Sequence, residues 1–415
     1  MGGVTGRRTV LFATIAAGGG HVATAEAMAE ALARFHGDAF EARVSDVMAE
    51  VGPAWLDRSH KRSWKRMLGR PRWIRASQRV MDRMPRPTHA WQSVLLDRFA
   101  RRAAAAVNAI EPALVVANHG WLATGFSRAR RRYGLRAPVV VYETEPFDAS
   151  ALWFAPDAER YVAPSIAAKA ALTRLGVPAS RIDVLGYPVR ESFLTAPGRD
   201  EARRDLDLDG RFTCLLSLGA EGVSGRALAI ARAIAEAGHA VIAVAGRNLE
   251  LERAFRELAG TFPSVRPIGF SRDMPRLLAA CDIVVGKAGP ASVMEALAVG
   301  RPVVVTGYAG LNEEAVLRFL LRRGVGTYAP DDEGLRAALA AWSSSPGRRL
   351  DAARVCRGLA FPEMRRAIAA ALVGYAKLGT GAASTEPAPG GIAAVTPEDL
   401  SGQDVRFGAA RGATA

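Results

Sequence analysis

Short apolar runs alternate with longer stretches of helical periodicity over the first 190 residues. The first run, TVLFAT at residues 9–14, is soon followed by three glycines, and an alanine-rich helical stretch covers residues 22–35. A run that is apolar at nearly every position is typical of a strand in a parallel sheet whose two faces are both covered by helices. Further strand-like runs lie at residues 41–47, 113–118, 138–143, 160–164 and 183–186. The alternation predicts a doubly wound α/β domain.

The alternation breaks near Arg190 and then starts again. Residues 191–210 are polar and punctuated by glycine and proline, which predicts a linker and a short helix. Strand-like runs resume at residues 212–218, 240–246, 264–270, 282–287 and 302–307. Because 415 residues exceed the size of a single hydrophobic core, we expect two domains, residues 1–195 and 196–378. Residues 379–415 are rich in Gly, Ala, Pro, Ser and Thr, which predicts a disordered tail.

Composition narrows the class of protein. An apolar content of 49% is sufficient for two cores. The cysteines, Cys214, Cys281 and Cys356, lie far apart and form no CxxC pair, so we expect a reducing cytosol and no metal or disulfide site. No apolar run approaches the roughly 20 residues that cross a bilayer, which predicts a soluble or peripheral protein.

The formal charge of +14 is concentrated in one segment of the chain. Residues 58–86 contain eleven basic side chains and one acidic side chain, Asp82. Tryptophan, methionine and aliphatic residues lie among them, a composition typical of a segment at an anionic membrane surface. Nucleic acid and an ordinary solvated face are the alternatives, although no nucleic-acid-binding module accompanies the segment. The candidate membrane residues are Arg62, Trp64, Lys65, Arg66, Arg72 and Trp73.

A glycine turn lies where the first predicted strand leads into a helix. At Gly18, Gly19, Gly20 and His21, unhindered backbone amides and the positive end of the helix dipole can bind an anionic group. The His21 imidazole can take a proton from an attacking hydroxyl, or it can simply cap the helix. The turn also fits the pattern GxGxxA, and Asp46 could bind a ribose, so a dinucleotide-binding dehydrogenase is an alternative.

A second strand-to-helix junction lies at residues 282–297. The predicted strand ends in Lys287, Ala288, Gly289 and Pro290, and a helix is expected from about Ser292 with Glu295 in its first turn. Such a helix start can face a diphosphate, and a carboxylate there can accept both hydroxyls of a ribose. Alternatively, the carboxylate only complements the helix dipole.

Six motifs together resemble the monogalactosyldiacylglycerol synthase and processive diacylglycerol glucosyltransferase family, a relative of the N-acetylglucosaminyltransferase that acts on the peptidoglycan lipid intermediate. The resemblance covers roughly residues 9–330 in order. Its motifs are GGGHVATAEAMAEAL from residue 18, GYPVRESF from 186, LGAEG from 218, AGRN from 245, GFSRDM from 269 and KAGPASVMEAL from 287.

This resemblance implies the GT-B fold, two Rossmann-like domains that face each other across a cleft. The N-terminal domain would bind acceptor and membrane, and the C-terminal domain a UDP-hexose. By position, His21 matches the proposed family base, His119 matches another family histidine on the acceptor side, and Glu295 matches the ribose-binding glutamate. The other implied donor-site residues are Gly219, Glu221, Arg247, Phe270, Met274, Lys287, Ala288, Gly289, Pro290, Asn312 and Glu313.

The family inverts the anomeric carbon and needs no metal or other cofactor, since helix dipoles and basic groups stabilise the leaving diphosphate. The resemblance therefore implies transfer of galactose or glucose to a diacylglycerol-type lipid. We expect a monomer or weak homodimer, peripheral on the cytoplasmic face of the cell membrane, with no nucleic-acid partner.

The sequence departs from the family at two places, which leaves other functions open. Where members carry a GQExxN-like stretch for the donor sugar, this chain has Leu311, Asn312, Glu313 and Val316, and no His-Pro pair precedes Trp153. The first departure leaves the sugar open, and the second leaves the acceptor open. The alternatives are a glycosyltransferase for a soluble small molecule and a UDP-sugar-binding protein without activity.

Overall fold

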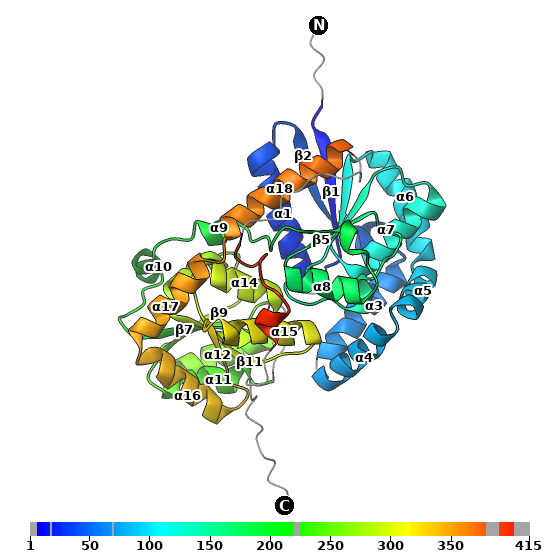
Figure 1. Cartoon of the computed structure of the whole chain (residues 1–415). Helices are drawn as coiled ribbons and strands as arrows, with labels where there is room; N and C mark the ends of the chain where they lie inside the picture. The colour runs from blue at the N-terminus through cyan, green and yellow to red at the C-terminus, as the bar shows by residue number, and fades with distance from the viewer. Residues whose placement is uncertain (1–5, 17–18, 69, 220–224, 379–389, 402–415) are drawn as a thin grey trace, which may run out of the picture.

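Two parallel β-sheets of six strands each form the centre of the molecule (Figure 1). The computed structural model describes residues 6–16, 19–68, 70–219, 225–378 and 390–401. The strands of the N-terminal sheet are β1 (Arg8–Thr14), β2 (Phe40–Asp46), β3 (Leu114–Ala117), β4 (Val139–Tyr142), β5 (Arg160–Ala163) and β6 (Ile182–Val184). Those of the C-terminal sheet are β7 (Thr213–Ser217), β8 (Ala240–Val244), β9 (Val265–Ile268), β10 (Ile283–Lys287), β11 (Val303–Gly307) and β12 (Gly326–Tyr328). The predicted strands therefore form to within two residues, and β12 is an addition.

The helices occupy the connections between the strands and cover both faces of each sheet. In the N-terminal half they are α1 (Gly20–His36), α2 (Val47–Val51), α3 (Ala54–Leu68), α4 (Pro71–Arg83), α5 (Pro85–Leu95), α6 (Asp97–Ile110), α7 (Gly120–Tyr133), η1 (Ala151–Trp153), α8 (Ile166–Arg174) and η2 (Ala179–Arg181). The linker holds α9 (Glu191–Leu194) and α10 (Arg199–Asp205). The C-terminal half holds α11 (Ala227–Glu236), α12 (Leu249–Thr261), α13 (Met274–Ala280), α14 (Pro290–Ala298), α15 (Leu311–Arg322), α16 (Asp332–Ser343), α17 (Pro346–Arg357), α18 (Phe361–Leu378) and η3 (Glu398–Leu400).

Alternation along β1 explains why its run is apolar at nearly every position. Val10 and Phe12 pack into the apolar cluster with α1 and α18, whereas Leu11 and Ala13 pack into the opposite cluster with α6 and α7. Successive strand side chains point to opposite faces, so both faces must be apolar when helices cover both. The doubly wound prediction is confirmed.

Strand order places a switch point in each sheet. The N-terminal order is β2-β1-β3-β4-β5-β6 and the C-terminal order is β12-β11-β10-β7-β8-β9. The direction in which successive strands are added therefore reverses beside β1 and β3, and beside β7 and β10. Ligands of open parallel sheets bind at the carboxyl ends of the strands beside such a reversal.

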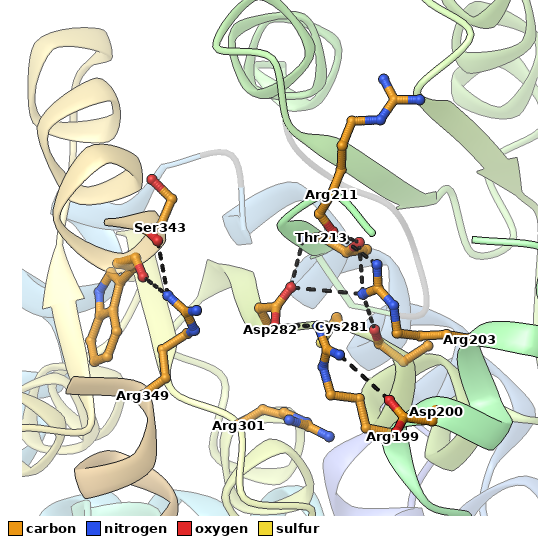
Figure 2. A network of polar contacts seen from close by, with 12 residues as sticks. Arg199, Asp200, Arg203, Arg211, Thr213, Cys281, Asp282, Arg301, Ser343 and Arg349 are labelled. Carbon is orange, nitrogen blue, oxygen red and sulfur yellow. Dashed lines mark hydrogen bonds and ion pairs between the residues drawn. The ribbon is translucent and has the colours of Figure 1, made fainter. Parts of the chain in front are cut away.

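A polar network at the amino ends of β7 and β10 ties the linker helix α10 to the C-terminal sheet (Figure 2). The buried Arg203 guanidinium donates to Thr213 Oγ1 and to the Ala280 carbonyl, each at 3.1 Å. The Asp282 carboxylate accepts from the Thr213 amide and from Arg199, each at 2.8 Å. The network lies at the edge opposite the switch point, so it serves the attachment of α10.

Helix α18 returns to the N-terminal half, although the sequence analysis placed residues 361–378 with the C-terminal domain. Figure 1 shows α18, in orange, crossing from α17 to a position beside α1. Ile368, Leu372 and Tyr375 are buried against the N-terminal sheet. Gly186 has φ +90°, and a Cβ at this position would clash with Met364 of α18, since it would be 2.1 Å from Met364 Sδ. The apolar face of α18 therefore covers strands of the first domain.

Residues 390–401 are packed, in contrast to the disorder expected for this part of the tail. Ile392 and Val395 are fully buried in the C-terminal apolar cluster. The amides of Ile166 and Ala167, at the start of α8, donate to the carbonyls of Ala393 and Val395 at 3.1 and 2.9 Å. Burial of these few apolar side chains between two domains orders a segment whose composition is otherwise polar and small. The rest of the expected tail, 379–389 and 402–415, lies outside the described residues.

Five helices, α2 to α6, fill the connection between β2 and β3 and contain the basic segment. Arg62, Arg66, Arg72 and Trp73 are exposed on α3 and α4, and 71% of Trp73 is accessible. The side chains of Trp64 and Lys65 lie outside the described residues. Among the helices that the structure describes, none combines the length and apolar character needed to cross a bilayer.

Candidate active site

His21 lies at the switch point of the N-terminal sheet, as the second residue of α1. Its Nδ1 is 3.0 Å from Thr144 Oγ1, beyond the end of β4, and its carbonyl accepts from Asn118 Nδ2 at 3.1 Å. Burial lowers the pKa of His21 to about 4, so the imidazole is neutral at pH 7. In the tautomer whose Nδ1–H donates a hydrogen bond to Thr144 Oγ1, the lone pair of Nε2 is available to a substrate hydroxyl.

Two further histidines lie beside His21. The ring of His119 is 4.7 Å from that of His21, and the ring of His60 is 5.3 Å from that of His119. His119 Nδ1 accepts from the Trp121 amide at 3.1 Å and thereby caps α7. Burial lowers the pKa of both His60 and His119, so these rings add no charge at neutral pH. Within the described part of the chain, no group of three or more His, Cys, Asp or Glu side chains is arranged to hold a metal ion.

Carboxylates follow β4 on the same edge of the sheet. Asn312 Nδ2, from the C-terminal domain, donates to Glu145 Oε2 at 2.7 Å. Burial raises the pKa of Glu145 to about 7 and that of Asp148 to about 6. Glu143 is fully buried, and its Oε1 accepts from the Glu145 amide at 2.8 Å. Glu145 therefore lies at the contact between the domains, one residue after Thr144, the partner of His21.

Glu295 lies at the switch point of the C-terminal sheet. Helix α14 begins at Pro290, two residues earlier than expected, so Glu295 is in the second turn rather than the first. Burial raises its pKa to about 7, and Arg190 Nη2 donates to its Oε1 at 3.1 Å. A pocket beside it is lined by residues that include Ser217, Met274, Lys287 and Ser292. Because Glu295 lines this pocket, its carboxylate can accept hydrogen bonds from the hydroxyls of a ligand. A carboxylate that only complemented the helix dipole would lie in the first turn and would need no pocket.

The other predicted donor-site residues lie mostly along the same edge. Lys287 Nζ is 3.1 Å from Glu313 Oε1, and Glu313 Oε2 accepts from the Ala309 amide at 2.7 Å. Gly219 follows β7 at φ +89°, a conformation that favours glycine, and a Cβ there would be 3.6 Å from Lys287 Cε. Ala288 is buried, and Gly289 caps the start of α14.

Arg247 and Phe270 form a separate pair beyond β8 and β9. The Arg247 guanidinium is 4.5 Å from the centroid of the Phe270 ring, which is half exposed. A planar cation and an accessible aromatic ring together provide a surface on which a base can stack. Glu221 and Gly18, which the sequence analysis also selected, lie outside the described residues.

The two halves of the site face each other. Helix α1 meets α14 at their amino ends, since a Cβ on Gly20 would be 3.7 Å from Ala291 Cβ. Arg190 bridges the same helices, with Nη1 3.5 Å from Glu26 on α1 and Nη2 3.1 Å from Glu295 on α14. Gly19, Gly20 and His21 therefore open onto the cleft that contains the Glu295 pocket.

Several residues of this site were not selected from sequence, among them His60, Thr144, Glu145 and Arg190. Thr144 and Glu145 directly follow a buried strand, the signal that did identify His21, and the same rule would have found them. Asp46, proposed as a ribose ligand in a dehydrogenase, instead caps α2 through the Ala49 amide at 3.1 Å and pairs with Lys61 at 2.9 Å. Because its carboxylate has these partners, Asp46 is not available to bind a ribose as the dehydrogenase alternative required.

Part of the C-terminal half of the chain matches a known glycosyltransferase domain. Residues 217–314 match the glycosyltransferase family 28 C-terminal domain. A rice protein (Oryza sativa subsp. japonica) assigned as monogalactosyldiacylglycerol synthase 2 is 28% identical over 349 residues, which cover 81% of this chain and 73% of that protein. Monogalactosyldiacylglycerol synthase 1 of Arabidopsis thaliana is also 28% identical, with 80% of this chain and 64% of that protein aligned. The resemblance predicted from the motifs is confirmed.

Solved structures share the two-domain arrangement. Anabaena HepE in complex with UDP has a TM-score of 0.53 at 18% identity, over 88% of this chain and 99% of that chain. A Listeria monocytogenes protein assigned as a UDP-N-acetylglucosamine 2-epimerase has a TM-score of 0.61 at 13% identity, over 92% of this chain and all of that chain. The fold is GT-B, as predicted, and at these identities the structures establish the fold alone.

Proposed function

We propose that this homologue of the monogalactosyldiacylglycerol synthases transfers a hexose from a UDP-hexose to the hydroxyl of a diacylglycerol-type lipid at a membrane surface, with inversion. The single observation that carries the proposal is the meeting of α1 and α14 at their amino ends, with His21 on one side and the Glu295 pocket on the other. An acceptor base and a donor pocket on facing domains are the two parts that a direct displacement needs.

In the proposed step, the acceptor oxygen attacks the anomeric carbon while its proton moves to His21 Nε2. The bond from that carbon to the diphosphate oxygen breaks, and UDP leaves with the electron pair. The low pKa of His21 keeps the imidazole unprotonated, and a diphosphate bound opposite it raises that pKa as proton transfer proceeds. Lys287 and the amino end of α14 stabilise the leaving charge, so the step requires no metal ion.

The remaining donor-site residues each contact one part of the UDP-hexose in this proposal. Glu295 accepts hydrogen bonds from the ribose hydroxyls, and Arg247 and Phe270 border the uracil. Asn312 and Glu313, at the start of α15, face the sugar. Contacts of these two side chains with the sugar hydroxyls would select the hexose. Because the sequence departs from the family pattern here, the hexose can differ from that of the family.

The direct test is incubation with separate UDP-hexoses and vesicles that contain diacylglycerol, with the lipid product identified by mass spectrometry. We expect one UDP-hexose to give a hexosyl lipid, and His21→Ala to lower kcat by about 10²- to 10⁴-fold with the fold preserved. His60→Ala is the matched control, since it removes a neighbouring imidazole that takes no proton in the step. Release of free hexose with no lipid product, or turnover of His21→Ala near wild type, contradicts the proposal.

The membrane part of the proposal is tested by sedimentation with vesicles. Exposed basic side chains and Trp73 on α3 and α4 form the candidate contact surface. Arg72→Ser should weaken binding to anionic vesicles about fivefold, since one basic residue near such a surface contributes about 1 kcal/mol. The control is Leu249→Ser, at an apolar residue 65% exposed on the C-terminal domain. No binding of the wild type would instead favour a soluble acceptor.

A further inference from the structure

The amino end of α15 has no cap of its own. Its N-cap residue is Gly310, which has no side chain to accept the first amide hydrogens of the helix. Unpaired amides at a helix start are costly when they are withdrawn from water, and a polar side chain normally accepts one of them. The first turn of α15 carries Asn312 and Glu313, so the geometry of this end decides where both side chains point.

A residue of the other domain supplies the missing cap. Gln78 lies on α4, and its Oε1 accepts from the Leu311 amide at 2.9 Å. A Cβ on Gly310 would be 3.1 Å from both the Oε1 and the Nε2 of Gln78, so a glycine at this position permits the close approach. The contact joins residues 233 positions apart in the chain.

Arg75 reinforces the contact from the same face of α4, one turn earlier. Its Nη1 lies 3.4 Å from the carbonyl oxygens of Tyr308 and Ala309, and its guanidinium is 5.1 Å from the centroid of the Tyr308 ring. Residues three apart share one side of a helix. Two side chains of α4 therefore hold the connection from β11 to α15, while the exposed Trp73 lies on the outside of the same helix.

We propose that Gln78 is a positioning residue that completes the hexose-binding end of α15 only when the two domains are closed. The inference rests on the proposed function for the assignment of Asn312 and Glu313 to the sugar. In an open cleft α4 moves away from α15, the Leu311 amide loses its acceptor, and the first turn is free to fray. Recognition of the hexose is thereby coupled to closure by the acceptor domain, whereas recognition of the uracil by Arg247 and Phe270 is not.

The test compares UDP with the UDP-hexose as calorimetric ligands at pH 8. In Gln78→Ala we expect affinity for the UDP-hexose to fall about fivefold, the typical effect of losing one helix cap, with affinity for UDP unchanged. The KM for the UDP-hexose should rise by the same factor. Ser77→Ala is the matched control, because its hydroxyl bonds only within α4, to the Ile74 carbonyl at 2.9 Å. Gln78→Glu retains an acceptor at the helix start and should restore the affinity for the UDP-hexose.

A second variant disrupts the same contact from the C-terminal domain. In Gly310→Ala the new methyl group meets the Gln78 amide and Asn312 Oδ1, and we expect the same selective loss for the UDP-hexose. Equal affinities of wild type and Gln78→Ala for the UDP-hexose, or an equal loss for UDP and the UDP-hexose, would overturn the positioning role. A wild type that binds neither ligand would instead refute the proposed function, so the two failures are distinct.

Discussion

The ionisation of Glu295 makes donor binding depend on pH near neutrality. Burial raises its pKa to about 7, and the charge of Arg190 only partly opposes that shift. A raised carboxyl pKa means that Glu295 is protonated below pH 7 and ionised above it. In its proposed role the ionised carboxylate accepts hydrogen bonds from both ribose hydroxyls, so the affinity for the donor should rise with pH. About nine tenths of the carboxyl is ionised one unit above the pKa and about one tenth one unit below it, so affinity should fall about tenfold from pH 8 to pH 6.

The assay is calorimetry with a UDP-hexose, whose diphosphate is esterified at both ends. Free UDP is unsuitable, because its terminal phosphate has a pKa of about 6 and titrates in the same range. Glu295→Gln should bind more weakly than the wild type and with no change from pH 8 to pH 6. Glu145→Gln is the comparison variant, since Glu145 also has a pKa of about 7 and, through its contact with Asn312, is the other group that could make donor binding depend on pH. A pH dependence that persists in Glu295→Gln and disappears in Glu145→Gln would refute the assignment of the ribose to Glu295.

Two further predictions concern stability. Burial raises the pKa of Glu145 from its ordinary value of 4.5 to about 7 in the folded protein, so this group lowers the free energy of unfolding as pH rises from about 4.5 to 7. Glu145→Gln should therefore raise the melting temperature more at pH 8 than at pH 5, and an equal effect at both pH values would contradict the buried carboxyl. Ile392→Ala should lower the free energy of unfolding by about 2–5 kcal/mol, measured by urea denaturation, because its side chain is fully buried; an unchanged midpoint would mean that residues 390–401 do not pack.

Local pattern was sufficient to place the strands and the two strand-to-helix junctions that carry His21 and Glu295. The run at residues 282–287 is buried by neighbours on both faces, so its composition alone identifies β10, and Glu295 follows it at a fixed spacing. β12 has three residues at the edge of its sheet, too few to give a periodic signal. Gln78 and His60 lie within a basic helical segment that resembles a solvated surface. Their roles depend on partners far away in the chain, Leu311 and His119, which no local pattern specifies.

The same limit applies to the tail. Composition correctly reports that residues 379–415 contain few large apolar side chains, and a segment with so few cannot form a core of its own. It can still be ordered by a core that already exists. Ile392 and Val395 enter the C-terminal apolar cluster, and the backbone between them pairs with the free amides at the start of α8. Prediction of disorder from composition fails where a short segment has a preformed site on the folded domains.

The two sides of the interdomain contact differ in chemistry, and this difference determines where the molecule can open. On the side of α18 and residues 390–401 the contact is apolar: Leu372 packs on the N-terminal sheet, and Phe147 stacks on Phe319 of α15 at 4.4 Å between ring centroids, so separation there exposes apolar surface to water. On the cleft side three polar contacts join the halves: Arg190 with Glu295, Asn312 with Glu145, and Gln78 with the Leu311 amide. A hydrogen bond that can be exchanged for water contributes only about 1 kcal/mol. The cleft side should therefore open while α18 stays in place. In the proposed site a ribose at Glu295 would take the place of Arg190, so entry of the donor and opening of this bridge would be a single event.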